Sequence, residues 1–207
     1  MELHIGKYAF PHPAGKPGDE PVAIGADLLP QTLLDAYGYG FFPWHTSAYG
    51  PCWYHPDPRM VLFPHKLKVQ KSMRPYLNGK HFTWKMNTCF SDVLDHCAHV
   101  PRHDGGGTWI WPEYVEAMNE MHRLGHAYSF ETYSEGALVG GLYGLYIKGI
   151  FFGESMFSLE SNASKYAFIQ MVHNLEGLRL IDCQTPGKHL ELLGAEIISR
   201  DNFMQLL

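Results

Sequence analysis

The second half of the chain alternates between strand-like and helix-like spacing of apolar residues. Three stretches rich in apolar residues, 126–133, 137–147 and 149–157, are separated only by the short sequences SEG and KG. This spacing predicts three consecutive strands joined by tight hairpin turns. The stretch 161–177 then has helical spacing, with Ser161 or Asn162 as its cap and Gly177 as its end.

The C-terminal segments complete an α+β pattern. Residues 178–184 and 195–199 are predicted strands, with a short helix at 187–194 between them and a last helical turn at 200–207. The order β-β-β-α-β-α-β puts an antiparallel meander before a helix and a strand that can lie parallel to the last meander strand. We predict an α+β fold with a mixed sheet and flanking helices, in the order found in GCN5-related N-acetyltransferases.

The first half of the chain is less regular. Strands are predicted at 59–63 and 81–86, with a basic, helical stretch between them, and helices at 90–100 and 111–125. Before them, one helix is predicted within 29–40, and prolines interrupt the aromatic stretches that follow it. We therefore predict a small irregular N-terminal domain over residues 1–60 and a main domain over 61–207.

Three polar residues interrupt the apolar strands of the main domain. Glu154 lies in GIFFGESMF, and Asp182 and Gln184 lie two positions apart in LIDCQ, so on a strand they share one face. If the two strands are neighbours, all three side chains converge at the strand ends. A carboxylate in an apolar setting needs a partner or a shifted pKa, and a substrate ammonium or guanidinium is a natural partner.

The apolar residues around these three allow two interpretations. They form either core or the wall of a pocket for a hydrophobic side chain. The residues are Phe151, Phe152, Met156, Phe157, Phe168 and Met171.

Charge is distributed unevenly along the chain. The net charge is −5, yet residues 59–85 carry seven Lys and Arg and no Asp or Glu. A block of one sign is typical of a surface that binds a phosphate backbone or another anion, although a solvated face gives the same pattern. The seven residues are Arg59, Lys66, Lys68, Lys71, Arg74, Lys80 and Lys85.

Several other kinds of site are disfavoured. The histidines and cysteine of DHCAHVPRH, at 95–103, have no familiar zinc spacing, so we predict no metal. A Cys-His nucleophile built on Cys183 has little support, and the chain contains no G-x-S-x-G, P-loop or G-x-G-x-x-G motif. Its four cysteines are widely spaced, which favours free thiols.

The sequence predicts no targeting signal. No apolar run approaches the roughly 18 residues of a membrane span. The first ten residues, MELHIGKYAF, lack the basic start and long apolar run of a signal peptide. We predict a cytoplasmic protein that does not enter a membrane.

Long motifs of the chain resemble one family over residues 8–207. These are IGADLLPQTLLDAYGYGFFPWH, WYHPDPRMVL, GTWI, LVGGLYGLYIKGIFFGESMFS, NASKYA and LIDCQTPGKHLELLGAEIISRDNF. They are similar to leucyl/phenylalanyl-tRNA–protein transferases. The resemblance implies an enzyme that moves Leu, Phe or Met from aminoacyl-tRNA to the α-amine of proteins beginning with Arg or Lys. The product would be recognised for degradation in the N-degron pathway.

The resemblance also implies roles for individual residues. Trp44 and Trp109 would hold the 3′ end of the aminoacyl-tRNA, and Glu154 would receive the α-amino group of the transferred residue. Asp182 and Gln184 would handle the acceptor. The basic block would bind tRNA, chiefly through Lys66, Lys68, Lys71 and Arg74. The amino-acid pocket and its surroundings would use Leu142, Phe151, Met156, Ser158, Phe168, Met171 and Ile181.

The implied enzyme needs no cofactor and is predicted to be a monomer. The chain departs from the family pattern at Ala26, Lys71 and Leu159, where Gly, Arg and Arg are usual. Two alternatives remain: an acetyl-CoA-dependent N-acetyltransferase and a non-enzymatic RNA-binding module. The turn SLESNAS lacks the glycines that the first needs, and the second leaves Glu154, Asp182 and Gln184 unexplained.

Overall fold

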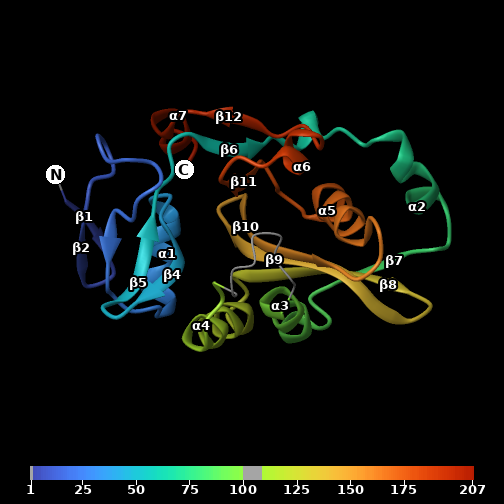
Figure 1. Ribbon diagram of the computed structural model, residues 1–207, viewed down its shortest axis with the longest axis horizontal. Coiled ribbons are helices and arrows are strands. Elements are labelled where there is room, and N and C mark those ends of the chain that lie inside the picture. Colours follow the sequence, from blue (N-terminus) through green and yellow to red (C-terminus); the bar gives the residue numbers. More distant parts are fainter. Residues whose placement is uncertain (1, 100–108) are drawn as a thin grey trace.

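A seven-stranded mixed sheet organises the larger part of the molecule. The computed structural model describes residues 2–99 and 109–207 (Figure 1). The strand order is β12-β6-β11-β10-β9-β8-β7. The strands are β6 (Arg59–Leu62), β7 (Thr83–Met86), β8 (Ala127–Ser134), β9 (Ala137–Ile147), β10 (Ile150–Ser158), β11 (Leu180–Gln184) and β12 (Glu196–Ile198).

The predicted meander and crossover are confirmed. β8, β9 and β10 pair antiparallel, and α5 (Ala163–Asn174) leads from β10 to β11, which pairs parallel with β10. Both hairpin turns hold two consecutive residues at positive φ, Glu135 with Gly136 and Lys148 with Gly149. Positive φ at both central positions is the requirement of a tight type I′ turn. The α+β class with a mixed sheet and flanking helices is therefore established by the topology.

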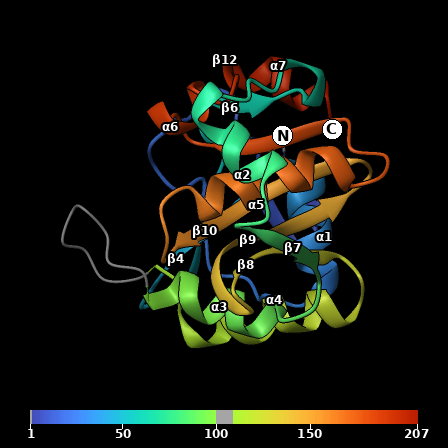
Figure 2. The same ribbon diagram turned by 90° about the vertical axis from the view of Figure 1, so that its right-hand side faces the viewer.

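Helices cover both faces of this sheet. α5 packs on one face, and α3 (Phe90–His99) and α4 (Pro112–Arg123) lie on the other (Figures 1 and 2). The basic stretch forms two short 3₁₀ turns, η1 (Pro64–Lys66) and η2 (Lys71–Met73), and helix α2 (Arg74–Asn78). Met73 and Phe82 share an apolar cluster with Tyr166 and Ile169 of α5, so this stretch is anchored beside that helix.

The N-terminal segment is more regular than the sequence predicted. It forms a hairpin of β1 (Glu2–Ile5) and β2 (Tyr8–Pro11), and a three-stranded sheet in the order β3-β5-β4. These strands are β3 (Ala23–Ile24), β4 (Phe42–Ser47) and β5 (Gly50–Tyr54), and helix α1 (Pro30–Gly38) packs nearby. The expectation of an irregular segment was wrong: Pro43 lies in the edge strand β4, where a missing N–H is tolerated, and Pro51 lies at the second position of the central strand β5.

Aromatic contacts hold this segment together. Phe10 meets Phe41 and Trp53 edge to face, with ring centroids 5.6 and 5.4 Å apart. The proposed boundary between residues 60 and 61 falls inside β6, a strand of the large sheet. The division into two domains stays a prediction.

The last two helices close the C-terminal end. α6 (Lys188–Glu191) follows β11, and α7 (Arg200–Met204) follows β12. β6 lies between β11 and β12 and pairs antiparallel with both. β6 therefore places Arg59 next to β11, the strand that contains Asp182. Among the described residues, no helix is both long and apolar enough to cross a membrane.

Candidate active site

Two irregularities in neighbouring strands create the candidate site. β10 and β11 run together only over Ile150–Phe152 and Leu180–Asp182. Just beyond this, the β10–β9 register shifts between Gly153 and Ser155, and the β11–β6 register shifts between Asp182 and Gln184. Such bulges bend a strand and redirect its side chains. They lie side by side at the point where the two parallel strands stop pairing.

Glu154 is the extra residue of the first bulge, and three side chains donate hydrogen bonds to its carboxylate. The hydroxyl of Tyr37 donates to Oε1 at 2.8 Å and that of Tyr114 donates to Oε2 at 2.6 Å. Gln184 Nε2 also donates to Oε1, at 3.0 Å. The donors come from α1, α4 and the end of β11, so three distant segments orient one carboxylate.

Burial dominates the electrostatics of Glu154. Removal from water raises the pKa of its carboxyl from 4.5 to about 7, although the hydrogen bonds from Tyr114 and Tyr37 act in the opposite direction. Burial and the adjacent carboxylate raise the pKa of both phenols well above 10. The two tyrosines therefore remain donors at neutral pH, while Glu154 titrates there.

A stability measurement checks this pKa. The folded state holds the Glu154 proton more tightly than the unfolded state does, so ionisation of Glu154 costs folding free energy as pH rises from 4.5 to about 7. Glu154→Gln removes this cost. The variant's free energy of unfolding relative to the parent should rise by roughly 3 kcal/mol across that window and stay constant above it. Urea unfolding at pH 4.5, 6 and 8 measures the difference, and a pH-independent difference contradicts the shifted pKa.

Asp182 has a partner that the sequence did not predict. Arg59 Nε donates to Oδ1 at 2.8 Å and Arg59 Nη2 donates to Oδ2. Both side chains are fully buried, and the guanidinium lies against the rings of Phe42 and Phe203 at 5.0 and 4.4 Å from their centroids. Arg59 therefore belongs to the site, not to an exposed basic surface.

The bulge also separates Asp182 from Gln184. The two side chains do not share one face of a regular strand, because Cys183 is inserted between paired positions and Gln184 has a φ of +62°. Gln184 turns toward Glu154, while its backbone N–H donates to Asp182 Oδ1 at 2.9 Å. The Arg59–Asp182 pair thus supports the backbone that aims Gln184.

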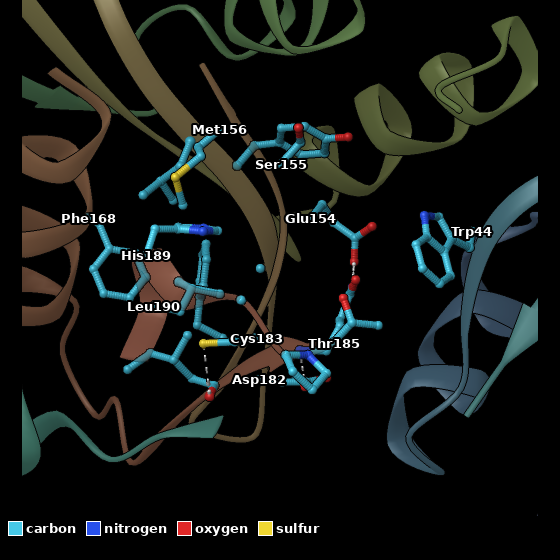
Figure 3. Close-up of a pocket in the computed structure, with 18 of the residues that line it drawn as sticks. Trp44, Glu154, Ser155, Met156, Phe168, Asp182, Cys183, Thr185, His189 and Leu190 are labelled. Carbon is cyan, nitrogen blue, oxygen red and sulfur yellow. Dashed lines mark hydrogen bonds between the residues drawn. The ribbon is translucent and has the colours of Figure 1, made fainter. Parts of the chain in front are cut away.

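A cavity of about 300 Å³ opens beside these groups. Figure 3 shows Trp44 and Glu154 at one end of it, with Met156, Phe168 and His189 at the other. Ten of the residues predicted for the site line it, in agreement with one continuous pocket. They are Trp44, Trp109, Leu142, Phe151, Glu154, Met156, Phe168, Ile181, Asp182 and Gln184.

Two residues predicted to contact substrate lie elsewhere. Met171 is fully buried in the apolar cluster beneath the cavity. The Ser158 hydroxyl accepts from the N–H of Ser164 at 3.0 Å and donates to the carbonyl of Glu160, so it stabilises the start of α5. The sequence predicted Ser161 or Asn162 as the cap of α5, but Asn162 at the N-cap position makes no side-chain capping hydrogen bond, and Ser158 supplies one instead.

Sequence reasoning missed several groups of the site. Tyr37 and Tyr114 hold Glu154, and Thr185, Pro186, His189 and Leu190 complete the wall after β11. Burial and nearby Lys165 lower the pKa of His189, which favours its neutral form. Burial raises the pKa of the Cys183 thiol, which opposes its use as a nucleophile.

Only part of the predicted basic surface is available to bind phosphate, because one of its lysines already has an acidic partner. Lys66 forms an ion pair with Glu196, with Nζ 2.7 Å from Oε2. In the described part of the chain, no ion pair involves Lys68, Lys71 or Arg74. These three are the better candidates for contacts with phosphate.

The histidine-rich stretch shows no grouping of metal ligands where it is described. His96 stacks on Phe157 with centroids 4.6 Å apart, and Cys97 is buried. Residues 2–99 and 109–207 contain no group of three His, Cys, Asp or Glu that could hold a metal ion. His103 lies outside the described residues.

Sequence comparisons assign the chain to one family. Residues 61–207 match the family described as "Leucyl/phenylalanyl-tRNA protein transferase", and residues 26–57 match its N-terminal domain. A protein of that name from Christiangramia forsetii is 48% identical over 202 residues, which is 96% of this chain and 95% of the relative.

Solved structures are more distant. FemX aligns over 86% of this chain and 71% of its own, with 10% identity and a TM-score of 0.48. A GCN5-related N-acetyltransferase from Kribbella flavida aligns over 68% and 53%, with 15% identity and a TM-score of 0.34. These likenesses carry no argument about activity. The sequence matches span both parts of the chain and include every residue that lines the cavity. Together with the 48% identity to the relative from Christiangramia forsetii, they show that this chain belongs to the leucyl/phenylalanyl-tRNA–protein transferase family.

Proposed function

We propose that this transferase moves Leu, Phe or Met from an aminoacyl-tRNA to the N-terminal α-amine of polypeptides beginning with Arg or Lys. One observation supports this most directly. The Glu154 carboxylate, held by Tyr37, Tyr114 and Gln184, lies at one end of a cavity whose opposite end is lined by the apolar side chains of Met156 and Phe168. This is the arrangement needed to bind an amino acid by its ammonium and its apolar side chain together.

Glu154 binds the α-ammonium of the transferred residue. An ammonium beside the carboxylate favours its ionised form, so binding lowers the pKa of Glu154 from its value of about 7 in the empty site. Met156, Phe168 and Leu142 contact the side chain of the amino acid. Unbranched and γ-branched chains fit this slot, whereas a β-branched chain crowds its wall, and such discrimination is worth about 1–3 kcal/mol per methylene.

Gln184 positions the acceptor amine. Its Nε2 is engaged by Glu154, which leaves the amide oxygen to accept from the attacking amine. The amine must be neutral to attack, and an amide oxygen orients it without acting as a strong base. Asp182, neutralised by Arg59, supports Gln184 through the backbone N–H and does not bind a cationic acceptor directly.

The reaction balances without a cofactor. The acceptor nitrogen forms a bond to the ester carbon, and the bond from that carbon to the ribose oxygen breaks. The proton lost by the amine passes to this leaving oxygen, directly or through water. Because the ester is already activated, the enzyme acts mainly by positioning. Trp44 and Trp109 at the cavity wall stack on the terminal adenosine.

The cellular role follows as part of the proposal. The enzyme acts in the cytoplasm as a monomer, and its products enter the N-degron pathway for degradation. The direct test mixes the protein with tRNA charged with labelled Phe or Leu and a peptide beginning with Arg. Label should appear in the peptide, and a peptide with an acetylated N-terminus should receive none. No transfer to the free peptide, in conditions where a related transferase works, overturns the proposal.

Charge reversal on the basic stretch should weaken tRNA binding. The triple variant Lys68→Glu, Lys71→Glu, Arg74→Glu is expected to raise KM for Phe-tRNA at least 10-fold, with little change in kcat. The slope of log KM against log salt should fall by about 2 to 3, because each phosphate contact contributes roughly 0.7–0.9. Lys16→Glu, an exposed change in the N-terminal segment, is the control. An unchanged salt slope shows that tRNA binds elsewhere.

A further inference from the structure

Among the described residues, no strand pairs with the outer edge of β4, and this free edge begins at the active site. β4 is the outermost strand of the three-stranded sheet, and in the described residues it pairs only with β5. Trp44, near its start, lines the cavity, and residues 44–47 are all exposed. A free edge presents unpaired backbone N–H and C=O groups to any extended chain beside it.

A second cavity lies farther along the same strand. It has a volume of about 390 Å³. Its lining consists of Thr46 of β4, Gly50 and Pro51 of the paired strand β5, Trp111 and Glu113 at the start of α4, and Ala26, Asp27 and Leu28. Two chain segments run from the first cavity to the second. In β4, Trp44 lines the first cavity and Thr46 lines the second; before α4, Trp109 lines the first and Trp111 lines the second. An extended strand advances about 3.3 Å per residue, so the hollows are neighbours along β4.

The charges on this side fit a polypeptide and not RNA. None of the residues lining the second cavity is Lys or Arg, and two are carboxylates. Asp27 is partly neutralised by Lys7, 3.3 Å away, and accepts hydrogen bonds from Tyr8 and Thr32, so Glu113 is the freer charge. The basic stretch of η2 and α2 lies on the opposite side of the active site from β4 (Figure 1).

We propose that the acceptor polypeptide docks as an added strand on the free edge of β4, with its N-terminus at Trp44 and Gln184. From there the chain runs parallel to β4 toward Thr46 and the second cavity. The inference rests on the proposed function, because that function makes a polypeptide N-terminus the acceptor. Backbone hydrogen bonds to an edge strand suit an enzyme whose acceptors differ in sequence after the first residue.

Synthetic acceptors test this docking. The edge at 44–47 accommodates about three or four residues. With Phe-tRNA as donor, kcat/KM for peptides beginning with Arg should rise about 10-fold or more from two to five residues and then level off. In a parallel pair only alternate residues of the added strand bond to the edge. N-methylation of one alternating set of amides should cost roughly fivefold per methyl group, and methylation of the other set less than twofold.

Two carboxylate variants provide a matched comparison on α4. Glu113→Gln should raise KM for an Arg-Lys peptide severalfold, while Glu116→Gln, exposed on the same helix but outside the cavity, should not. Neither should change KM for Phe-tRNA.

Three results overturn the inference. The first is an equal kcat/KM for two- and five-residue acceptors, and the second is an equal loss of kcat/KM for both methylated sets. The third is a Glu113→Gln variant that changes KM for Phe-tRNA and not KM for the peptide, which would assign this side to RNA. Each still shows transfer, so the proposed function survives. Absence of transfer to every peptide contradicts the proposed function itself.

Discussion

Asp182→Leu is expected to abolish most transfer activity, because the backbone N–H of Gln184 loses its acceptor, and to destabilise the protein. The substitution leaves the Arg59 guanidinium fully buried without a countercharge. Breaking a buried pair in this way costs about 3–5 kcal/mol of unfolding free energy. For a chain of this size that corresponds to a fall in melting temperature of roughly 10 °C. Thermal unfolding and transfer assays below the transition measure the two effects separately.

The companion variants distinguish the structural from the catalytic consequence. Arg59→Met alone should destabilise similarly, because it leaves a buried carboxylate unpaired. The double variant Arg59→Met, Asp182→Leu should recover most of the stability, since apolar replacement of a buried pair is often neutral or stabilising. It should not recover transfer, because the backbone N–H of Gln184 loses its acceptor. A stable and fully active double variant contradicts the supporting role assigned to Asp182.

Glu154→Gln is expected to lower kcat/KM for transfer about 100-fold, while the affinity for uncharged tRNA changes little. The amide keeps the size of the side chain but loses the charge-assisted hydrogen bond to the α-ammonium, which is worth about 1.5–3 kcal/mol. Steady-state kinetics with Phe-tRNA, together with inhibition by uncharged tRNA, separates the two quantities. A loss confined to tRNA affinity contradicts the role given to Glu154.

The pH profile supplies a second readout of the same residue. Below pH 7, kcat/KM of the parent should fall with a slope near two, because Glu154 and the acceptor amine both gain a proton there. The acceptor amine has a pKa of roughly 7.7–8.0 and titrates in either protein, so Glu154→Gln should show a slope near one. Tyr37→Phe and Tyr114→Phe each remove one donor to the carboxylate. Each should therefore move the Glu154 inflection to higher pH.

Local features of the chain were predictable from sequence. SEG and KG predict tight turns because each is short and ends in a glycine, which tolerates positive φ, so the three meander strands and their order followed directly. The convergence of Glu154 with Gln184 also followed, since a crossover helix places β11 beside β10. Long-range pairings were not predictable in this way. β6 inserts between β11 and β12, and no local pattern indicates which strand will be its neighbour.

The sequence by itself determined the fold class, the family and most of the wall of the cavity, because spacing and turn chemistry are local properties. Only the tertiary structure decided what each polar group does. Asp182 and Arg59 are 123 positions apart, and Glu154 and Tyr37 are 117 apart, so their contacts depend on how whole elements pack. The two bulges turned Gln184 away from Asp182 and toward Glu154. Burial among these packed elements then raised the pKa of Glu154 to about 7, because less water reaches the carboxylate to stabilise its charge.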